Sequence, residues 1–512
     1  MLYEVSATGG ETVPVQTSLP NPVPLDISPD LSELLVWSCT GAITSFQKAC
    51  PLWVLPVVGR SPRRLGKVLA SIGASWSPDG KRVAYVQEDG VYRVEIDDAD
   101  SHKIVSATSI GGLPRWPQWS PDGNRLVFAV WTEDHGQSLW EASSDGKNLR
   151  RLFSGWNDPP DECCGGWTPD GKYLLFRSQR RGITGIWTIR ERRSFFRKVS
   201  REPVELTSGP TSTFGPVLSP DGKKMYVISS QTGAELVRYD SASRQFTGYL
   251  PGVTAMGIDF SQDGRRVAYV AYPERTLWRC NTDGSEQLQL TFPPLKVIQP
   301  RWSPDGTRIA FMAQESFKPF RVYVIPADGG SPEQPTPSDR RGADPTWSTD
   351  GSSLLFGHPP GDEPPGALLG LEVVDLRTHA ISKVPGSEGL WSPRWSPDGR
   401  YILAISRTGD RLMLFDAKRQ NWAELAKISV NWPQWSRKGD YIYFVGRPTV
   451  DQPTGVFRVR IRDRKLEQVI SLKDFRHAPD DWGWLGLTRD DSPLLLRDTT
   501  TQDIYALDWE AP

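Results

Sequence analysis

The sequence is short of the residues and patterns on which several classes of protein depend. Its five cysteines are too few, and odd in number, for a complete disulfide framework. Lys and Arg together number 60 against 61 Asp and Glu, a formal net charge of −1, so the broad basic surface of a dedicated nucleic-acid binder is missing. No stretch approaches the roughly 18 consecutive apolar residues of a membrane-spanning helix. We therefore expect neither direct nucleic-acid binding nor membrane insertion.

Signals of targeting and of catalysis are also missing. The first six residues have neither the basic start nor the apolar run of a secretory leader, so we expect a soluble chain. The sequence leaves the cytoplasm open and, if an anchor lies upstream, the periplasm. The five histidines show no metal-binding spacing, and no P-loop, His-Glu-x-x-His, dinucleotide fingerprint or Gly-x-Ser-x-Gly elbow occurs. We expect no catalytic residues, no cofactor and no metal.

Turn-forming residues, by contrast, are abundant, with 46 glycines and 44 prolines. Many belong to one phrase, Trp-Ser-Pro-Asp-Gly, which recurs along the whole chain in eleven copies, three of them degraded. The copies begin at Ile27, Trp76, Trp119, Trp167, Leu218, Phe260, Trp302, Trp347, Trp395, Trp435 and Leu487. The first and last copies lie ten repeats apart, a mean period of about 46 residues, which is typical of propeller blades.

Each repeat has the pattern of a small antiparallel sheet. Ser-Pro-Asp-Gly is turn chemistry, because Pro presets φ, Asp accepts from nearby amides and Gly takes a positive φ. A short apolar run follows, as at residues 82–86, and then an alternating run, as at 139–142, and a third short strand. With the residues before the motif as the innermost strand, each repeat supplies four strands. The sequence therefore predicts an all-β fold, a β-propeller of about eleven four-stranded blade units.

Eleven units exceed the roughly four to eight blades of one ring, so we expect two tandem propellers. A boundary near residue 250 gives five units and an N-terminal half-blade in residues 1–250, and six units in 251–512; a boundary near 205 is the alternative. Residues 2–15 resemble the outer half of a blade, and the last unit lacks its fourth strand. Either the N-terminal strands complete the last blade, or the chain is the remainder of a longer protein.

The repeat resembles that of a known family. Trp-Ser-Pro-Asp-Gly-Lys/Arg-x-Ile/Val-Ala-Phe/Tyr, followed by Ile/Leu-Trp/Tyr, is similar to the WD-type repeat of TolB-like propellers, and the likeness covers nearly the whole chain. Members of this kind are mostly protein-interaction or ligand-binding scaffolds. Some bacterial arrays follow a winged-helix or kinase domain, and no such segment occurs in this sequence.

Most aromatic and acidic residues of the repeat have a structural interpretation. The motif aspartates shape turns, and the motif tryptophans, with those of the third strand, should pack between blades with each indole N–H bound to an acceptor. The candidates for binding lie in connections that lead into the innermost strands, on a face where propellers commonly bind. They are Trp116, Trp156, Asp158, Asp161, Glu162, Trp391, Trp432, His477, Asp481 and Trp482.

The cysteines allow several chemistries. Cys163 and Cys164 are adjacent in an acidic loop, which is compatible with a vicinal disulfide, a soft-metal site or an ordinary folded loop. Cys39 and Cys50 bracket a short loop and would pair in an oxidising compartment.

Together these features predict a non-catalytic scaffold that presents its loops to a protein, a peptide or a small ligand. Two alternatives stay open: the sensor module of a transcriptional regulator or kinase whose effector domain lies upstream, and a hydrolase or lyase with its site in a central channel.

Overall fold

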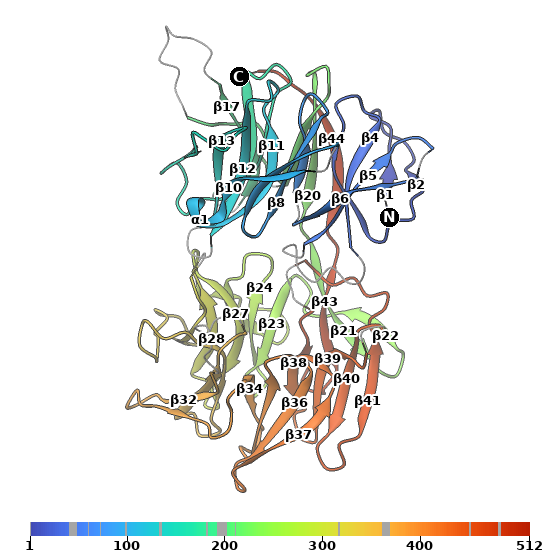
Figure 1. Ribbon diagram of the computed structural model, residues 1–512. Helices are drawn as coiled ribbons and strands as arrows, with labels where there is room; N and C mark the ends of the chain where they lie inside the picture. Colours follow the sequence, from blue (N-terminus) through green and yellow to red (C-terminus); the bar gives the residue numbers. More distant parts are fainter. Residues whose placement is uncertain are drawn as a thin grey trace. The chain divides into compact units, whose positions relative to one another are not determined.

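The computed structural model describes every residue except 1, 40–48, 60, 72, 98–99, 133–135, 181–182, 192–201, 210, 316–317, 361–368, 450–451, 480–482 and 512. The chain divides into two compact units: unit 1 is residues 1–231 with 501–512, and unit 2 is residues 232–500. The break after residue 231 lies between the boundaries near 250 and 205 that the repeats suggest, because residues 234–248 pair in unit 2, and the last strand of the chain belongs to unit 1. Nearly all regular structure is β (Figure 1), in agreement with the predicted fold class.

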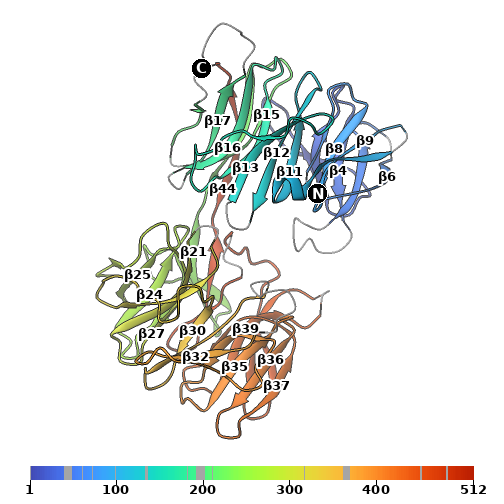
Figure 2. The ribbon, with the colours of Figure 1, turned by 60° about the vertical axis from the view of Figure 1, so that its left-hand side comes forward.

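Within the described residues, unit 1 contains five blade sheets. Their strands are β3 (Pro22–Ile27), β4 (Glu33–Ser38), β5 (Cys50–Pro56) and β6 (Arg63–Ala70); β7 (Ala74–Trp76), β8 (Arg82–Gln87), β9 (Gly90–Glu95) and β10 (Ser101–Ser106); β11 (Leu113–Trp119), β12 (Arg125–Thr132), β13 (Gly136–Ser143) and β14 (Arg150–Arg151); β15 (Glu162–Trp167), β16 (Tyr173–Arg180), β17 (Ile183–Arg190) and β18 (Val204–Glu205); and β19 (Ser212–Leu218), β20 (Lys224–Gln231) and β44 (Thr501–Asp508). The innermost strands β3, β7, β11, β15 and β19 contact one another in that order (Figure 2). A single-turn helix, α1 (Ala107–Ile110), links the second and third blades.

Unit 2 contains six blade sheets in its described residues. Their strands are β42 (Gly486–Leu487), β43 (Pro493–Asp498), β21 (Ala234–Asp240) and β22 (Gln245–Gly248); β23 (Ala255–Phe260), β24 (Arg266–Ala271), β25 (Leu277–Asn281) and β26 (Leu288–Gln289); β27 (Lys296–Trp302), β28 (Arg308–Gln314) and β29 (Arg321–Pro326); β30 (Ala343–Trp347), β31 (Ser353–Gly357), β32 (Glu372–Asp375) and β33 (Ile381–Lys383); β34 (Leu390–Trp395), β35 (Tyr401–Ser406), β36 (Arg411–Asp416) and β37 (Asn421–Lys427); and β38 (Ser429–Trp435), β39 (Tyr441–Arg447), β40 (Gly455–Arg460) and β41 (Leu466–Ser471). The innermost strands β42, β23, β27, β30, β34 and β38 contact in sequence, and β38 contacts β42. The ring of unit 2 is therefore closed.

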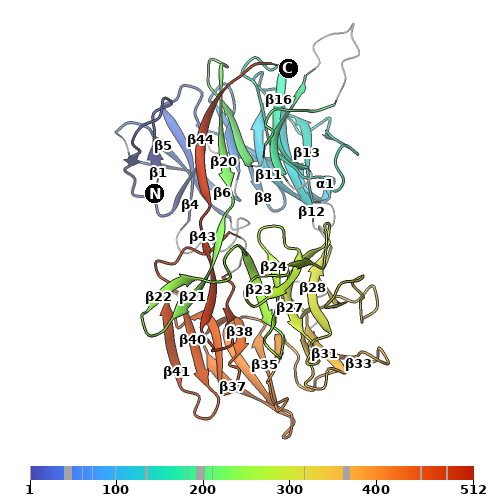
Figure 3. The same cartoon turned by 180° about the vertical axis from the view of Figure 1, so that it is seen from behind.

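The fifth repeat and the last repeat exchange their outer strands. β19 and β20 of the fifth repeat are completed by β44 of the last, which pairs with all eight residues of β20. In return, β21 and β22 of the fifth repeat complete the sheet of β42 and β43 in unit 2 (Figure 3). Each unit thus contains one sheet built from the fifth repeat and the last repeat.

The N-terminal strands do not complete the last blade, so that expectation is wrong. β1 (Leu2–Glu4) and β2 (Val13–Val15) pair with each other in a separate two-stranded sheet. Leu2 packs against Leu19, Val36 and Leu55 in unit 1. The place expected for them is taken by β21 and β22, whose sequence belongs to a repeat more than 200 residues away from the last one. Elsewhere in unit 1, Cys39 and Cys50 form a disulfide.

The Ser-Pro-Asp-Gly turn has the predicted geometry, as the copy at residues 120–123 shows. Asp122 accepts hydrogen bonds from the Ser120 hydroxyl at 2.6 Å and from the Asn124 amide at 3.1 Å. The bond from Ser120 is the main cause that lowers the pKa of Asp122. Gly123 has φ of +69°, which a residue with a Cβ rarely adopts. The motif aspartates are therefore occupied in their own turns.

In three blades of unit 2, the motif tryptophan ties the blade to the one before it. The indole N–H of Trp347 donates to the main-chain oxygen of Arg301 at 2.9 Å, and that of Trp302 donates to Asp259 O at 3.1 Å. The guanidinium of Arg308 lies 4.9 Å from the centre of the Trp347 ring. These residues connect neighbouring sheets through a hydrogen bond and a stacked cation, as the packing interpretation predicts.

In unit 1, the same tryptophans pack without the hydrogen bond. The indole nitrogens of Trp76, Trp119 and Trp167 are buried and have no acceptor among the described residues, which corrects the expectation of a partner for each. The stacked cation is kept, with Arg82 at 5.1 Å from the Trp119 ring and Arg125 at 5.3 Å from Trp167.

We predict that Trp347→Phe costs unit 2 about 1–2 kcal/mol of stability, because it leaves the carbonyl of Arg301 without its donor. The matched control is Trp119→Phe, since Trp119 and Trp347 are 7% and 6% exposed, each lies beside an arginine, and only the indole acceptor differs. Denaturant-dependent hydrogen exchange with mass spectrometry reads the two units separately. Equal losses in the two variants would contradict the role of the hydrogen bond.

We also predict that a chain ending at Thr500 destabilises unit 1 selectively, because β20 then loses the partner that pairs along its whole length. The apparent unfolding temperature of unit 1 should fall by about 5 °C or more, and residues of β20 should become sites of limited proteolysis. A chain ending at Trp509 keeps β44 and should behave as the full chain does. Unchanged cleavage in the shorter chain would show that the exchanged strand is dispensable.

Candidate functional site

A bulge that contains a left-handed residue recurs in the innermost strand of eight blades. Between fixed points of the register this strand gains one residue over its neighbour, as between Ala343 and Thr346 in β30. The extra residue is left-handed, with φ between +47° and +59°. In chain order these residues are Trp116, Cys164, Gly215, Gly257, Gln299, Asp344, Ser392 and Trp432. Bulges re-aim side chains and concentrate next to functional sites.

Six of these eight left-handed residues are not glycine, and a side chain in this conformation costs roughly 1 kcal/mol or more. In unit 2 four of them follow one another in successive blades: Gln299, Asp344, Ser392 and Trp432. The same strained backbone conformation recurs at equivalent positions of four blades, which marks these side chains as candidates for a functional site.

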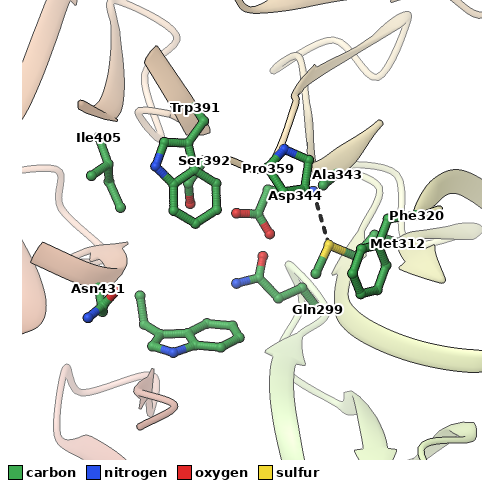
Figure 4. A pocket seen from close by; sticks show the side chains of 11 residues that line it. Gln299, Met312, Phe320, Ala343, Asp344, Pro359, Trp391, Ser392, Ile405 and Asn431 are labelled. Carbon is green, nitrogen blue, oxygen red and sulfur yellow. Dashed lines mark hydrogen bonds between the residues drawn. The ribbon is translucent and has the colours of Figure 1, made fainter. Parts of the chain in front are cut away.

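The four residues line one cavity of about 230 Å³ at the innermost strands of unit 2. Figure 4 shows the side chains of β27, β30 and β34 directed toward a common space. Much of the wall is apolar and includes Met312, Phe320 and Trp391. Among the described residues that line the cavity, Asp344 is the only one that carries a charge. An apolar hollow with a few polar groups is the usual form of a small-ligand site.

A buried arginine organises the polar side of the cavity. Arg394, 3% exposed, donates to Gln299 Oε1 and to Pro393 O, both at 2.7 Å, and its Nη2 lies 3.8 Å from Asp344 Oδ2. Burial lowers the pKa of Arg394 to about 10, so the guanidinium is charged at neutral pH. Arg394 holds Gln299 in place and lies beside the carboxylate of Asp344.

Two of the ten predicted site residues, Trp391 and Trp432, line this cavity together. The indole nitrogen of Trp391 is buried and has no acceptor among the described residues. Both tryptophans lie in bulged strands, and Trp432 is itself one of the left-handed residues.

The other described candidates lie elsewhere. His477 packs edge-on against Phe475, with ring centroids 4.9 Å apart, and pairs with Arg497 in an isolated bridge. Asp481 and Trp482 fall outside the described residues.

The remaining five candidates, all in unit 1, surround β15. Trp156 packs edge-on against Trp187 and Phe176, with centroids 5.0 and 5.7 Å apart, and Arg180 covers it at 4.7 Å, which is a packing role. Trp116 packs against the same core.

The acidic candidates of this loop differ in their surroundings. Asp158 is exposed, whereas Asp161 lies 3.7 Å from Arg177. Glu162 is completely buried, and neither of its carboxyl oxygens has a hydrogen-bond donor among the described residues. Burial is the main cause that raises the pKa of Glu162 to about 8, although Arg151 opposes it. This carboxyl is therefore mostly neutral at pH 7.

The adjacent cysteines are both free thiols in this structure. A hydrogen bond between them raises the pKa of Cys163 and lowers that of Cys164. Arg177 further favours the thiolate. The described part of the chain contains no cluster of His, Cys, Asp and Glu suited to a metal ion.

Sequence reasoning missed Gln299, Asp344 and Ser392, although a signal for them exists. Each of the four bulges around the cavity has the form x-Pro-x-Trp directly before Ser, as in Asp344-Pro345-Thr346-Trp347. The variable residue before Pro is the left-handed one that lines the cavity.

Comparison with known proteins identifies the family that part of the repeat array resembles. The family model of the TolB beta propeller domain matches residues 65–252. Residues 65–252 are therefore a TolB-like β-propeller segment. Its relatives are bacterial, and no helix in the described residues has the length and apolar character to cross a bilayer.

The names of the relatives indicate different kinds of protein. The protein named Uncharacterized peptidase YuxL of Bacillus subtilis is 25% identical over 264 residues, 49% of this chain and 31% of the relative. A Tol-Pal system protein TolB of Francisella tularensis is 25% identical over 45% of this chain and 53% of its own length. A TolB structure from Agrobacterium tumefaciens aligns over 52% of this chain and 99% of its own, with 19% identity and a TM-score of 0.41. The chain spans about a third to a half of these curated relatives.

We predict that Glu162→Gln stabilises unit 1, and increasingly so as the pH rises. The folded carboxyl has a pKa near 8 against an ordinary 4.5, so its contribution to stability is complete below about pH 4.5 and is lost as the pH rises toward 8. The amide has no charge to bury, and the gain at pH 7 should be about 3 kcal/mol. Denaturant titrations at pH 5, 7 and 8.5 measure it.

The control is Glu141→Gln in β13. Glu141 is also buried, but it is paired with Arg125 at 3.2 Å and Arg150 at 2.9 Å, so its removal should destabilise. A gain from Glu162→Gln that is the same at all three pH values would contradict the assignment of a neutral buried carboxyl.

Proposed function

We propose that the chain is a non-catalytic binding module whose ligand site is the cavity at the innermost strands of unit 2. The observation that carries the proposal is that four successive blades each place a left-handed bulge residue on one apolar cavity. Such backbone strain persists where the surrounding structure imposes it, and it concentrates at binding and catalytic sites.

The chemistry of the lining favours binding over catalysis. The cavity contains a hydroxyl in Ser392 and a carboxylate in Asp344, but no histidine, lysine or cysteine among its described lining residues. Activation of a serine needs a base within hydrogen-bonding reach, and no hydrogen bond joins Ser392 to Asp344 among the described residues. The matched part covers only 31% of the relative named as a peptidase. A sensor module of a longer protein would bind its ligand in the same cavity.

A fragment screen tests this proposal. We expect fragments that raise the melting temperature of the full chain to lose their effect in Trp391→Leu and in Trp432→Leu, because each change removes an aromatic wall of the cavity. The control is Trp422→Leu in β37, since Trp422 packs on Phe415 away from the cavity lining. Ligand-observed NMR confirms each hit. Fragment binding that survives both cavity variants, or a screen without hits in unit 2, would contradict the proposed site.

A further inference from the structure

We infer that the cavity of unit 2 selects a ligand with an ammonium group on a small apolar body, and that the carboxylate of Asp344 receives this group. The inference rests on the proposed function and specifies its ligand.

Asp344 has unused capacity to accept hydrogen bonds. The residue is 3% exposed, and no donor reaches its carboxylate among the described residues. Its main-chain amide donates to Met312 Sδ at 3.3 Å. Figure 4 shows the carboxylate turned toward the space beside Trp391 and Gln299. A buried acceptor without a donor is costly unless something supplies the donor.

Arg394 only partly satisfies this carboxylate. Its Nη2 lies 3.8 Å from Asp344 Oδ2, too far for a hydrogen bond, because the guanidinium donates to Gln299 and Pro393 instead. Arg394 does not line the cavity, whereas Asp344 does. A ligand therefore contacts the negative partner of this pair.

Asp259 and Arg301, the next charged residues near the cavity, have opposite charges. Asp259 is half-buried and accepts the main-chain N–H of Trp302 at 2.6 Å, and Arg301 opposes the desolvation that raises the pKa of Asp259. Neither residue lines the cavity. Asp344 is the one charge that a ligand in the cavity contacts directly.

The walls suit a cation with an apolar body. Trp391, Trp432 and Phe320 supply aromatic surfaces, and aromatic rings attract cations through the negative potential of their faces. A cavity of about 150 Å³ holds benzene, so the 230 Å³ available here admits a single ring with a short ammonium arm.

The test compares three probes of similar shape by calorimetric titration of the full chain: 2-phenylethylammonium, the neutral 2-phenylethanol and the anionic 3-phenylpropionate. We expect the ammonium ion to bind at least tenfold more tightly than the alcohol, and the carboxylate ion to bind most weakly. Equal affinities of the ammonium ion and the alcohol, or a preference for the carboxylate ion, would overturn the inference without any variant.

The variant Asp344→Asn keeps the size of the side chain and removes its charge. It should reduce the affinity for the ammonium ion to that for the alcohol, and leave the alcohol within about twofold of its affinity for the wild type. The control Asp474→Asn changes an exposed carboxylate of the same unit and should alter neither. An undiminished preference for the ammonium ion in Asp344→Asn would assign the selectivity to another group.

The same chemistry can come from a free amine or from a lysine of another protein. Nα-acetyl-lysine methylamide, against its Nε-acetylated form, measures the second source. Tighter binding of the charged lysine derivative than of 2-phenylethylammonium indicates a protein side chain, and the reverse order indicates a free amine. If all probes bind with equal affinity and lose affinity in Trp391→Leu, the result supports the proposed binding site and contradicts only the selectivity for an ammonium group. If no probe binds and the fragment screen also yields no hit in unit 2, the proposed function fails with it.

Discussion

The contact between each innermost strand and the next blade is the constraint on which the rest of this structure depends. In unit 2 a motif tryptophan donates to a carbonyl of the preceding blade and is stacked by its arginine, as with Trp347, Arg301 and Arg308. A four-stranded sheet alone buries only one narrow set of side chains, so a blade is stable only between two neighbours. The tryptophan supplies both the apolar area and a directional bond, and the bond fixes the height of one blade against the next.

The bulge in the innermost strands shapes the middle of the ring. The residues just before the motif bend while the strand stays paired, and the bulge with its left-handed residue takes up this bend. In unit 2 the chain places Gln299, Asp344, Ser392 and Trp432 at these positions, where they line the cavity. Gln299 and Asp344 also meet Arg394 of another blade there. The repeat thus supplies a common frame, and these four blades place a different side chain at the same position of it.

The sequence alone was sufficient for the frame, because turns and strands depend on neighbours along the chain. Ser120, Asp122 and Gly123 make the turn that their residue types predict. The cavity could be predicted only in part: Trp391 and Trp432 stood out as unusual residues, whereas Asp344 is an ordinary aspartate in sequence and gains its meaning from burial beside Arg394. The hydrogen-bond acceptors of the indole groups could not be predicted from the sequence. Trp119 and Trp347 have the same motif, but among the described residues only the indole N–H of Trp347 finds a carbonyl oxygen in the preceding blade.

The exchanged strands could not be read from the repeats, because every repeat contains the same strand types and pairing by chain order is the default. Their exchange makes neither unit a contiguous piece of chain. One sheet of unit 2 is built from residues 234–248 and 486–498. In unit 1, the edge of β20 is covered only when residues 501–508 pair with it. Contacts between segments so far apart in sequence carry a large loop-closure entropy and form late. The first five repeats must therefore remain with an uncovered edge at β20 until the last residues arrive. A bare strand edge pairs readily with other chains. The lysine at position 224, which pairs with Asp508 in the finished structure, limits that hazard.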